Sequence, residues 1–524
     1  MSAPTDIVLD RLPARLSGIV EHWAQDAPQA VALSQDGVTL SYSQLNEASR
    51  QAALWLRDYG VRPGDRLMVV AENCIAQLVL LFAAARMDAW LVNVNARLSA
   101  REVDAIAQHS QPRVVLYTGH ISAEAMAHAE RGGAELHEVA GAGLVQVGPL
   151  HTDCEPEPVH ASGNEQVAAL IYTTGTTGQP KGVMLTHRNL LFIAATSSHV
   201  RGLTPADRAY GVLPVTHVFG LASVALGTLY AGATLYLAAR YSPSAVVRAI
   251  QHDELTILQG VPAMYARLLE YDYGDWDPSN SSLRFIYAGG SPLDPTLKHE
   301  TERLFGRTLH NGYGMTETSP TISQTRIDAP RTDTSVGSVI PGIEIRIVDD
   351  QGVTVQRGEP GELWVRGPNV MKGYYHDDKL TALTVNPEGW LNTGDIVRQE
   401  ADGALFLIGR SKELIIRSGF NVYPIEVEAA LNAHPAVVQS AVVGRDGTDG
   451  NEEVIAFVEL DPAQDAPAAQ ALHEWLHPRL SPYKRPSQIV IMQAMPAAAT
   501  GKILKGQLKQ LAQQLRKEAL HPEP

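Results

Sequence analysis

The chain has 524 residues, more than one compact hydrophobic core usually accommodates, so its length predicts two or more domains. Hydrophobic residues make up 45% of it and charged residues 19%, a composition that excludes long disordered segments. The formal net charge of −15 argues against a nucleic-acid or anionic-membrane partner, and an anionic substrate would have to meet local cations.

The first part of the chain alternates helical and strand patterns. Apolar residues from Leu45 to Tyr59 recur at helical spacing and are followed by Gly60, which predicts a helix with a glycine cap. The apolar run 67–70 then predicts a strand. This alternation continues to about residue 140, and a polar stretch at 151–165 predicts a surface connection.

Short β-rich runs separated by helix-length segments follow, at residues 169–172, 209–213, 255–258 and 283–287. Such alternation favours mainly parallel sheets covered by helices. Frequent Gly and Pro between short strands at about 335–407 predict a smaller, mainly antiparallel element, a small distorted β-barrel. After it, we expect a helix at 424–433, two strands, a helix near Leu472 and a last helix from Ile503. The predicted fold class is therefore α/β, with a large domain at 1–410 and a small α+β domain at 411–524.

Cysteine usage and the N-terminus bear on location. Cys74 and Cys154 are far apart and lack metal-ligand spacing, which indicates free thiols in a reducing compartment. The first ten residues carry acids where a signal peptide would need bases and an apolar run. The uncharged stretch 221–239 approaches membrane-spanning length, but Gly227 and Gly232 interrupt it, so we interpret it as core. A cytoplasmic location is expected.

The most informative segment is 172–182, Tyr-Thr-Thr-Gly-Thr-Thr-Gly-Gln-Pro-Lys-Gly. It begins at the end of a predicted strand and is expected to lead into the helical run from His187. Its glycines permit close backbone approach, its threonines add hydroxyl donors, and its lysine adds a cation. It is not the Walker A pattern, because the Gly–Lys spacing differs and no Lys-Ser/Thr pair follows. The segment predicts a polyphosphate-binding loop, with a flexible turn as the alternative, and its candidate residues are Thr173, Thr174, Gly175, Thr176, Thr177, Gly178 and Lys181.

Five further motifs follow in order along the chain. They are Leu213-Pro-Val-Thr-His217, Asn311-Gly-Tyr-Gly-Met-Thr316-Glu317, Trp390-Leu-Asn-Thr-Gly-Asp395, Gly409-Arg410-Ser-Lys412-Glu413 and Thr500-Gly-Lys502. With the phosphate loop, they make the sequence resemble the adenylate-forming superfamily of acyl-CoA synthetases, firefly luciferases and peptide-synthetase adenylation domains. The resemblance spans about residues 170–505. It implies an AMP-forming carboxylate–CoA ligase that uses ATP, Mg²⁺ and CoA.

The resemblance also implies roles for individual residues around the nucleotide. Glu317 would bind Mg²⁺, since a hard carboxylate oxygen suits a hard cation, and Thr316 would hydrogen-bond the α-phosphate. Asp395 would accept both ribose hydroxyls, and Arg410 would also contact the ribose. The other implied nucleotide-binding residues are Gly289, Gly290, Ser291, Asn311, Gly312 and Tyr313.

In the same way, the C-terminal motifs imply the catalytic cation and a hinge. Lys502 would stabilise the charge that builds during adenylation. Lys412 would be the hinge about which a mobile C-terminal domain rotates between the two half-reactions. The loop around Gly419 would line the thiol channel. Many relatives carry a lysine just before that glycine, whereas Ser418 stands here, so individual CoA contacts stay open.

The acyl pocket is inferred from plant-type hydroxycinnamate–CoA ligases. Amino-acid-activating relatives carry an aspartate where Val218 stands, which argues against an amino-acid substrate. The implied wall is mostly apolar and holds no arginine, so a dicarboxylate ranks low, and an aryl acid ranks slightly ahead of a medium-chain fatty acid. Ordinary core packing is the other interpretation of the same side chains. The implied lining residues are His217, Phe219, Ser223, Tyr287, Gly290, Gly312, Gly314, Pro320, Thr321 and Ile322.

The same motifs leave three other functions open. A freestanding adenylation enzyme would load the acyl group onto a carrier-protein phosphopantetheine instead of CoA. A nucleotide sensor without catalysis should have lost Lys502, Glu317 or Lys181, all of which are present. Luciferase-type oxidation would need a specialised substrate. The partners expected are a small carboxylic acid and CoA, with no nucleic acid and no stable membrane insertion, and a homodimer is left open.

Overall fold

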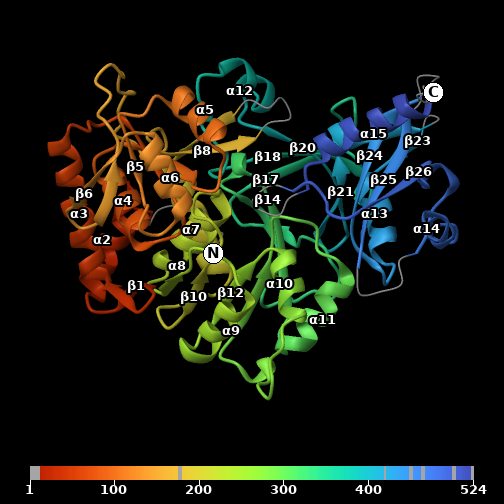
Figure 1. The fold of residues 1–524 in the computed structure, drawn as a ribbon, viewed down its shortest axis with the longest axis horizontal. Coiled ribbons are helices and arrows are strands. Elements are labelled where there is room, and N and C mark those ends of the chain that lie inside the picture. The colour runs from red at the N-terminus through yellow and green to blue at the C-terminus, as the bar shows by residue number, and fades with distance from the viewer. Residues whose placement is uncertain are drawn as a thin grey trace. The chain divides into compact units, whose positions relative to one another are not determined.

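The structure is a computed structural model that describes residues 12–174, 180–417, 420–447, 452–461, 467–497 and 503–520, without the side chains of Thr174 and of residues 517–520. Two compact units are formed (Figure 1). The first comprises residues 1–293, 297–345 and 365–391, and the second comprises 294–296, 346–364 and 392–524. The domain boundary predicted at residue 410 stays a prediction.

Within the described residues, the first unit contains a nine-stranded sheet in the order β16-β15-β14-β13-β12-β10-β11-β1-β2. Its centre, from β14 to β1, is parallel, and antiparallel strands complete both edges. The strands are β1 Val31–Gln35, β2 Val38–Ser41, β10 Arg208–Gly211, β11 Thr234–Leu237, β12 Ile257–Gly260, β13 Phe285–Ala288, β14 Leu309–Gly314, β15 Thr321–Gln324 and β16 Ser338–Val339.

The second sheet of this unit has eight described strands in the order β19-β9-β8-β4-β3-β5-β7-β6. Strands β8, β4, β3 and β5 run parallel. Strands β3 and β5 are buried along their whole length, as the apolar run of β3 predicts, and β4 and β8 along most of theirs. The strands are β3 Arg66–Ala71, β4 Trp90–Asn95, β5 Val114–Tyr117, β6 Glu135–Val139, β7 Gly143–Val147, β8 Val167–Thr174, β9 Pro180–Thr186 and β19 Gly373–Tyr374.

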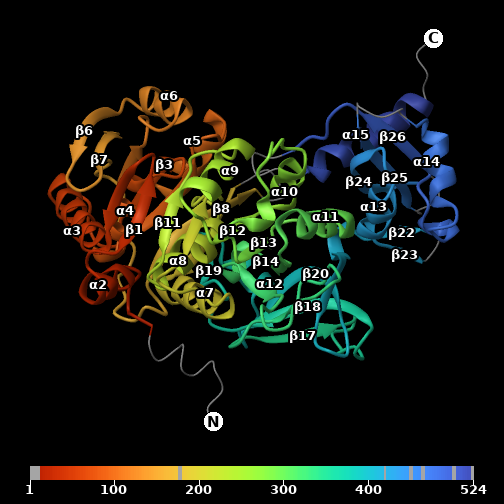
Figure 2. The same ribbon diagram turned by 90° about the horizontal axis from the view of Figure 1, so that it is seen from below.

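Helices pack between and around these two sheets. Helix α4 is buried on all sides because it contacts β1 of one sheet and β3 and β4 of the other. Helices α9, α10 and α11 lie along β12 to β14 in both ribbon views (Figures 1 and 2). The helices are α2 Ser17–Asp26, α3 Tyr42–Tyr59, α4 Ile75–Arg86, α5 Ala100–Ser110, α6 Ala123–Arg131, α7 His187–Val200, the π-helix η1 Phe219–Leu226, α8 Gly227–Tyr230, α9 Pro243–His252, α10 Pro262–Leu269, α11 Pro295–Phe305 and α12 Asp378–Thr384, with 3₁₀ turns η2 Pro278–Asn280 and η3 Thr316–Thr318.

Local sequence signals explain where these helices begin and end. Helix α3 starts at a capping box between Ser41 and Gln44 and ends at Gly60, whose φ of 111° suits glycine. The uncharged stretch 221–239 contributes to η1, α8 and β11, and Gly232, with a φ of 75°, separates α8 from β11. No helix of the described part of the chain is long and apolar enough to cross a membrane.

The second unit contains two described sheets and a hairpin. A four-stranded sheet, β17-β18-β20-β21, occupies much of the predicted β-rich region. Farther along the chain, β24 and β25 are antiparallel and β26 adds in parallel. The strands are β17 Glu344–Val348, β18 Pro360–Arg366, β20 Leu391–Gln399, β21 Leu405–Arg410, the hairpin β22 Ile415–Arg417 and β23 Phe420–Val422, and β24 Val437–Asp446, β25 Glu452–Leu460 and β26 Gln488–Met492.

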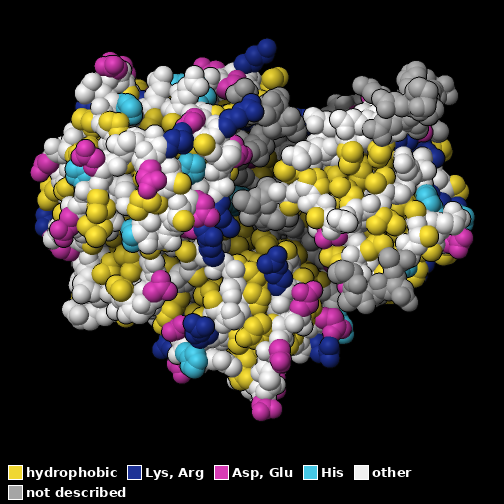
Figure 3. Space-filling model, viewed as in Figure 1, with side chains coloured by type: hydrophobic (Ala, Val, Ile, Leu, Met, Phe, Trp, Pro, Cys, Tyr) yellow, Lys and Arg dark blue, Asp and Glu magenta, His cyan; other side chains and the backbone are white. Residues whose placement is uncertain are grey.

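Helices cover both faces of the β24-β25-β26 sheet. Alternate residues of β24 point to opposite faces, so Val442 packs with α13 and α14 while Ala441 and Val443 pack with α15. The predicted helices at 424–433, near Leu472 and after Ile503 are confirmed as α13 Pro424–Asn432, α14 Ala469–Leu476 and α15 Lys505–Leu520, with η4 Ser411–Glu413 and η5 Pro482–Lys484 as short 3₁₀ turns. On the face shown in Figure 3, acidic and basic side chains are interspersed over the first unit.

Candidate active site

The described ends of the predicted phosphate loop belong to two paired strands, β8 and β9. Strands β8 and β9 are antiparallel, and Thr173 is paired with Lys181. The predicted helical run from His187 is confirmed as α7, which is capped by Thr186, and strand β9 connects the motif to it. Lys181 therefore projects from a strand. The candidates Gly175, Thr176, Thr177 and Gly178 lie outside the described residues, as does the side chain of Thr174.

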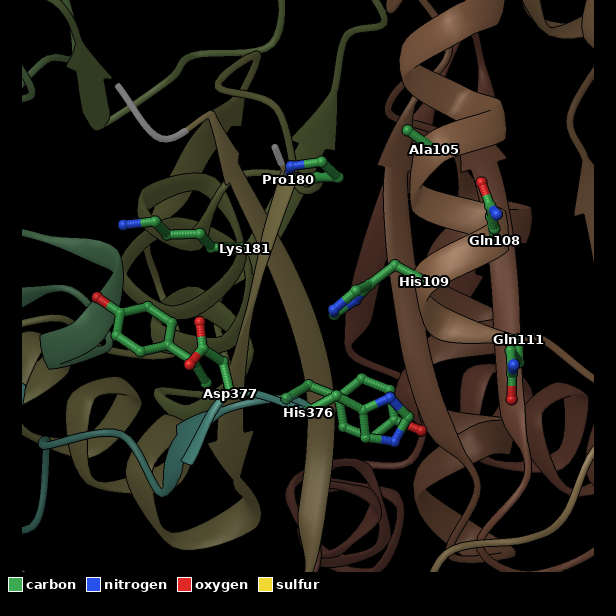
Figure 4. A pocket seen from close by; sticks show the side chains of 10 residues that line it. Ala105, Gln108, His109, Gln111, Pro180, Lys181, His376 and Asp377 are labelled. Carbon is green, nitrogen blue, oxygen red and sulfur yellow. The ribbon is translucent and has the colours of Figure 1, made fainter. Parts of the chain in front are cut away.

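Lys181 borders a cavity of about 540 Å³ in the first unit (Figure 4). His109 projects toward it from α5, and His376 and Asp377 come from the segment after β19. Burial chiefly lowers the pKa of His109, the neighbouring His376 lowers it further, and Asp377 opposes both. Ammonium, imidazole and amide groups make this wall suitable for a phosphate-bearing ligand. The lining residues are Ala105, Gln108, His109, Gln111, Pro180, Lys181, Tyr374, Tyr375, His376 and Asp377.

Tyr374 connects Lys181 with Glu317. The Lys181 ammonium lies 5.7 Å from the centre of the Tyr374 ring, and the Tyr374 hydroxyl donates a 2.7 Å hydrogen bond to Glu317 Oε1. Burial first, and the Glu317 carboxylate second, raise the pKa of Tyr374, so the phenol stays a donor.

Glu317 itself is held in place from two sides. It lies in η3 and is 8% exposed, and its backbone carbonyl accepts from the Met371 amide at 2.9 Å. Among the described residues, no group of three or more acidic, His or Cys side chains could hold a metal ion alone. A single fixed carboxylate nevertheless fits Mg²⁺, which is commonly held by one or two carboxylates together with substrate phosphates and water.

The predicted nucleotide residues follow two neighbouring parallel strands. Ala288 of β13 is paired with Asn311 of β14, so the segments after both strands meet at one edge of the sheet. Gly289, Gly290 and Ser291 follow β13, and Gly290 has a φ of 83°. Tyr313 and Gly312 lie near the end of β14, and Thr316 begins η3.

The side chain of Asn311, one of the implied nucleotide-binding residues, hydrogen-bonds to neighbouring backbone. Its amide nitrogen donates to the carbonyls of Thr334 and Ser335, both at 3.3 Å, and its oxygen accepts from the Gly312 amide at 2.9 Å. In this structure, Asn311 therefore supports the backbone around residues 334–335.

The remaining described candidates belong to the second unit. Asp395 of β20 is paired in register with Arg410 of β21, and Arg410 Nε lies 3.0 Å from Asp395 Oδ1. The two predicted ribose contacts are thus neighbours. Lys412 lies in η4, directly after β21. Gly419 and Lys502, the predicted thiol-channel and catalytic residues, lie outside the described residues.

Five of the predicted acyl-pocket residues come together in the first unit. The rings of Phe219 and Tyr287 meet edge to face with centroids 5.9 Å apart, and Ser223 Oγ lies 3.3 Å from Thr321 Oγ1. A Cβ on Gly312 would lie 2.0 Å from the Tyr287 hydroxyl, which explains the glycine. Of the others, Ile322 is fully buried, a Cβ on Gly314 would meet the Pro320 carbonyl, and His217 Nδ1 accepts from the Phe219 amide.

An arginine that the implied wall does not include lies directly behind two of its residues. Arg201, directly after α7, is completely buried and donates through Nη1 to the Ser223 carbonyl at 3.0 Å. Its guanidinium lies 4.7 Å from the centre of the Tyr287 ring. No sequence signal marked it, because a basic residue at a helix end is normally a solvated one. Tyr374 was missed for a similar reason, since no pattern distinguishes it from Tyr375.

This fold and site define an adenylate-forming enzyme. The family model described as AMP-binding enzyme matches residues 20–375, and that of the AMP-binding enzyme C-terminal domain matches 426–502. The chain therefore belongs to the AMP-binding enzyme family and to the acyl-CoA synthetase branch of the adenylate-forming superfamily, which confirms the predicted family, fold class and carboxylate–CoA ligase type.

Similar proteins include a feruloyl-CoA synthase of Amycolatopsis sp, 34% identical over 93% of this chain and 96% of the relative. 4-Coumarate–CoA ligase 2 of Oryza sativa subsp. japonica is 31% identical over 92% of this chain and 89% of the relative. Among solved structures, ATP-bound MatB from Rhodopseudomonas palustris has a TM-score of 0.84, with 28% identity over 95% of this chain and 99% of that one. The o-succinylbenzoate CoA synthetase MenE of Bacillus subtilis, in complex with ATP and a magnesium ion, has a TM-score of 0.80, with 30% identity over 94% and 99%.

Proposed function

We propose that the chain is an ATP-dependent acyl-CoA synthetase acting on an aryl or medium-chain carboxylic acid. A carboxylate oxygen attacks the α-phosphorus of ATP, giving acyl-AMP and pyrophosphate. The CoA thiol then attacks the acyl carbonyl, giving acyl-CoA and AMP. The observation that carries this proposal is the link from Lys181 through Tyr374 to Glu317, beside the paired strands β8 and β9 that flank the predicted phosphate loop. The names of the relatives support CoA as the acceptor.

Each group in this link has a task in the first step. Lys181 binds phosphate oxygens through charge. Glu317 would hold Mg²⁺, and the bound ion would supply positive charge against the phosphates. Tyr374 keeps the Glu317 carboxylate oriented by donating to one of its oxygens. The apolar faces of Phe219 and Tyr287 suit the acyl part of the substrate.

The test is acid-dependent pyrophosphate release with Mg-ATP across aryl, fatty, amino and dicarboxylic acids, followed by a comparison of thiol acceptors. We expect release with aryl or medium-chain acids and transfer to free CoA. Transfer only to a phosphopantetheinylated carrier protein would establish the loading enzyme instead. No release with any acid would rule out both.

We also propose Lys502 as the cation of the adenylation step. Lys502→Ala should lower acyl-AMP formation about 100-fold or more, because the charge on the departing pyrophosphate loses its stabilisation. CoA attack on a supplied acyl-adenylate should be largely unchanged. Measuring the two half-reactions separately checks this, and equal losses in both would contradict the role.

A further inference from the structure

A buried arginine without a carboxylate partner lies behind the predicted acyl pocket. Arg201 is 0% exposed. Its Nη1 donates to Gln259 Oε1 at 2.6 Å and to the Ser223 carbonyl at 3.0 Å, and both acceptors are neutral. Within the described part of the chain, no Asp or Glu forms an ion pair with it. Arginine is almost never fully buried unless it is paired with an anion.

The guanidinium also has donors left over. Arg201 Nε and Nη2 have no well-aligned hydrogen-bond acceptor among the described residues. The Gln259 amide nitrogen, which belongs to the same contact, is also without a partner there. Burial chiefly lowers the pKa of Arg201, and the charge and hydroxyl of the neighbouring Tyr287 oppose that shift. A buried donor that is left unsatisfied costs about 1–3 kcal/mol, and more when it is charged.

These donors adjoin residues already assigned to the acyl pocket. Arg201 contacts the carbonyl of Ser223, and its guanidinium lies over the ring of Tyr287. The Tyr287 hydroxyl lies against Gly312, and the Ser223 hydroxyl lies 3.3 Å from that of Thr321. The cluster is therefore continuous with the inner side of the pocket wall, whereas the predicted metal ligand Glu317 lies in η3 and bonds to Tyr374.

His310, a titratable residue near Arg201, does not provide the negative charge that a buried arginine usually pairs with. His310 on β14 is stacked on Phe285, and burial chiefly lowers its pKa to about 4, with the charges of Lys298 and Arg201 contributing. His310 is therefore neutral at physiological pH. The cluster as a whole is cationic and rich in donors, which suits an oxygen that accepts hydrogen bonds.

We propose that Arg201 determines specificity by binding an oxygen at the end of the acid substrate remote from the reacting carboxylate. This inference rests on the proposed function and narrows it to acids with a distal hydroxyl or carboxyl oxygen. The oxygen would accept from Arg201 Nε or Nη2 and from the Gln259 amide. An acid that lacks it would leave these buried donors unpaired, and such sites reject the deficient analogue strongly.

The test compares matched acids in the wild-type enzyme. Cinnamate and 4-hydroxycinnamate differ only in a distal hydroxyl, and hexanoate and hexanedioate differ in a distal carboxylate. We expect kcat/KM for pyrophosphate release to be at least about 10-fold higher for the oxygen-bearing acid in at least one pair, and the pair that responds identifies the oxygen. Activity without a preference in either pair would overturn the inference and leave the proposed function intact. No release with these acids or any other would overturn the proposed function itself.

Substitutions of Arg201 test whether this residue causes the preference for the oxygen-bearing acid. Arg201→Met should abolish this preference, whereas Arg201→Lys should retain part of it. Arg248→Met, at an exposed position on α9, is the matched control and should keep the wild-type ratio. A preference that survives Arg201→Met contradicts the assignment. Should that variant fail to fold, an unchanged ratio in Arg201→Lys would also contradict it, because a shorter ammonium cannot reproduce the guanidinium geometry.

Discussion

Two adjacent tyrosines make equivalent hydrogen bonds to different carboxylates. The Tyr374 hydroxyl donates to Glu317 at 2.7 Å, and the Tyr375 hydroxyl donates to Glu157 at 2.6 Å. Of these two carboxylates, only Glu317 is proposed to bind the metal. The pair therefore separates the effect of losing a buried phenol from the effect of releasing the metal ligand.

Tyr374→Phe should raise the Mg²⁺ concentration for half-maximal pyrophosphate release by about 10-fold, because orienting partners of metal ligands typically contribute 10- to 100-fold. A Mg²⁺ titration of the rate measures this. Tyr375→Phe should leave the Mg²⁺ dependence unchanged. Equal shifts in both variants would show that Tyr374 acts only in packing.

His187 makes the stability of the first unit sensitive to acid. It is fully buried, its Nδ1 accepts from the Leu16 amide, and burial chiefly lowers its pKa to about 3, with Arg15 contributing. Asp88, 4.0 Å away, is the acid facing its other nitrogen. At pH values between the ordinary histidine pKa of about 6.5 and the lower pKa in the folded protein, His187 is protonated in the unfolded chain but not in the folded one. The stability of the folded protein therefore falls as the pH falls.

His187→Gln should therefore flatten the acid side of the stability profile. As the pH falls from 6 to 4, the free energy of unfolding should decrease more slowly in the variant than in the wild type, by about 1.4 kcal/mol per pH unit. Urea unfolding at several pH values measures the slope. His22→Gln, at an exposed position on α2, should retain the wild-type slope. An unchanged slope in His187→Gln would contradict this account.

At the scale of single elements, α5 carries His109 to the cavity and depends on its cap. Ser99 accepts from the Glu102 amide, and the Glu102 carboxylate accepts from the Ser99 amide. Val103 and Ile106 hold the opposite face of the helix in the core. Losing this cap should loosen the first turn without disturbing the buried face.

Ser99→Ala should lower the free energy of unfolding of the first unit by about 1 kcal/mol, the usual cost of a lost N-cap. Ser99→Thr should retain most of this free energy, because a threonine hydroxyl can also accept the hydrogen bond at the N-terminus of the helix. Urea-unfolding midpoints of the two variants decide this. A loss for threonine as large as that for alanine would show that the hydrogen bond is not the cause.

Element types followed from the sequence wherever one pattern dominated. Helical spacing ending at Gly60 predicted α3, and apolar runs predicted β3, β8 and β13, because burial on one face or both leaves a clear period. Strand β9 was missed because Gly and Pro in its motif indicate a loop, while its strand form depends on pairing with β8. Arg201 and Tyr374 were missed because their importance arises from three-dimensional neighbours on other elements.

At the scale of the whole molecule, the predicted hinge lies at Lys412 in η4, between β21 and β22 of the second unit. The first half-reaction and the second are expected to need different domain arrangements, and backbone rotation at this residue would connect them. Lys412→Pro fixes φ near −65° and should slow thioester formation at least tenfold more than adenylation. Rapid-mixing measurements of each half-reaction give the comparison. Lys412→Ala, which leaves the backbone free, should affect both steps little, and equal slowing of both steps by proline would contradict a hinge.

The second unit is assembled from separated stretches of chain. Residues 346–364 and 392–524 belong to it, whereas residues 365–391 between them belong to the first unit. Asn392 donates to Glu362 at 2.9 Å, and the Thr393 hydroxyl donates to the Leu363 carbonyl at 2.8 Å, so β18 is joined to β20 by side chains as well as by the sheet. During synthesis, β18 is made before β20, the strand that covers one of its two edges. A released chain that ends near residue 390 would consequently expose one unpaired edge of β18, the kind of edge that chaperones shield and neighbouring chains capture.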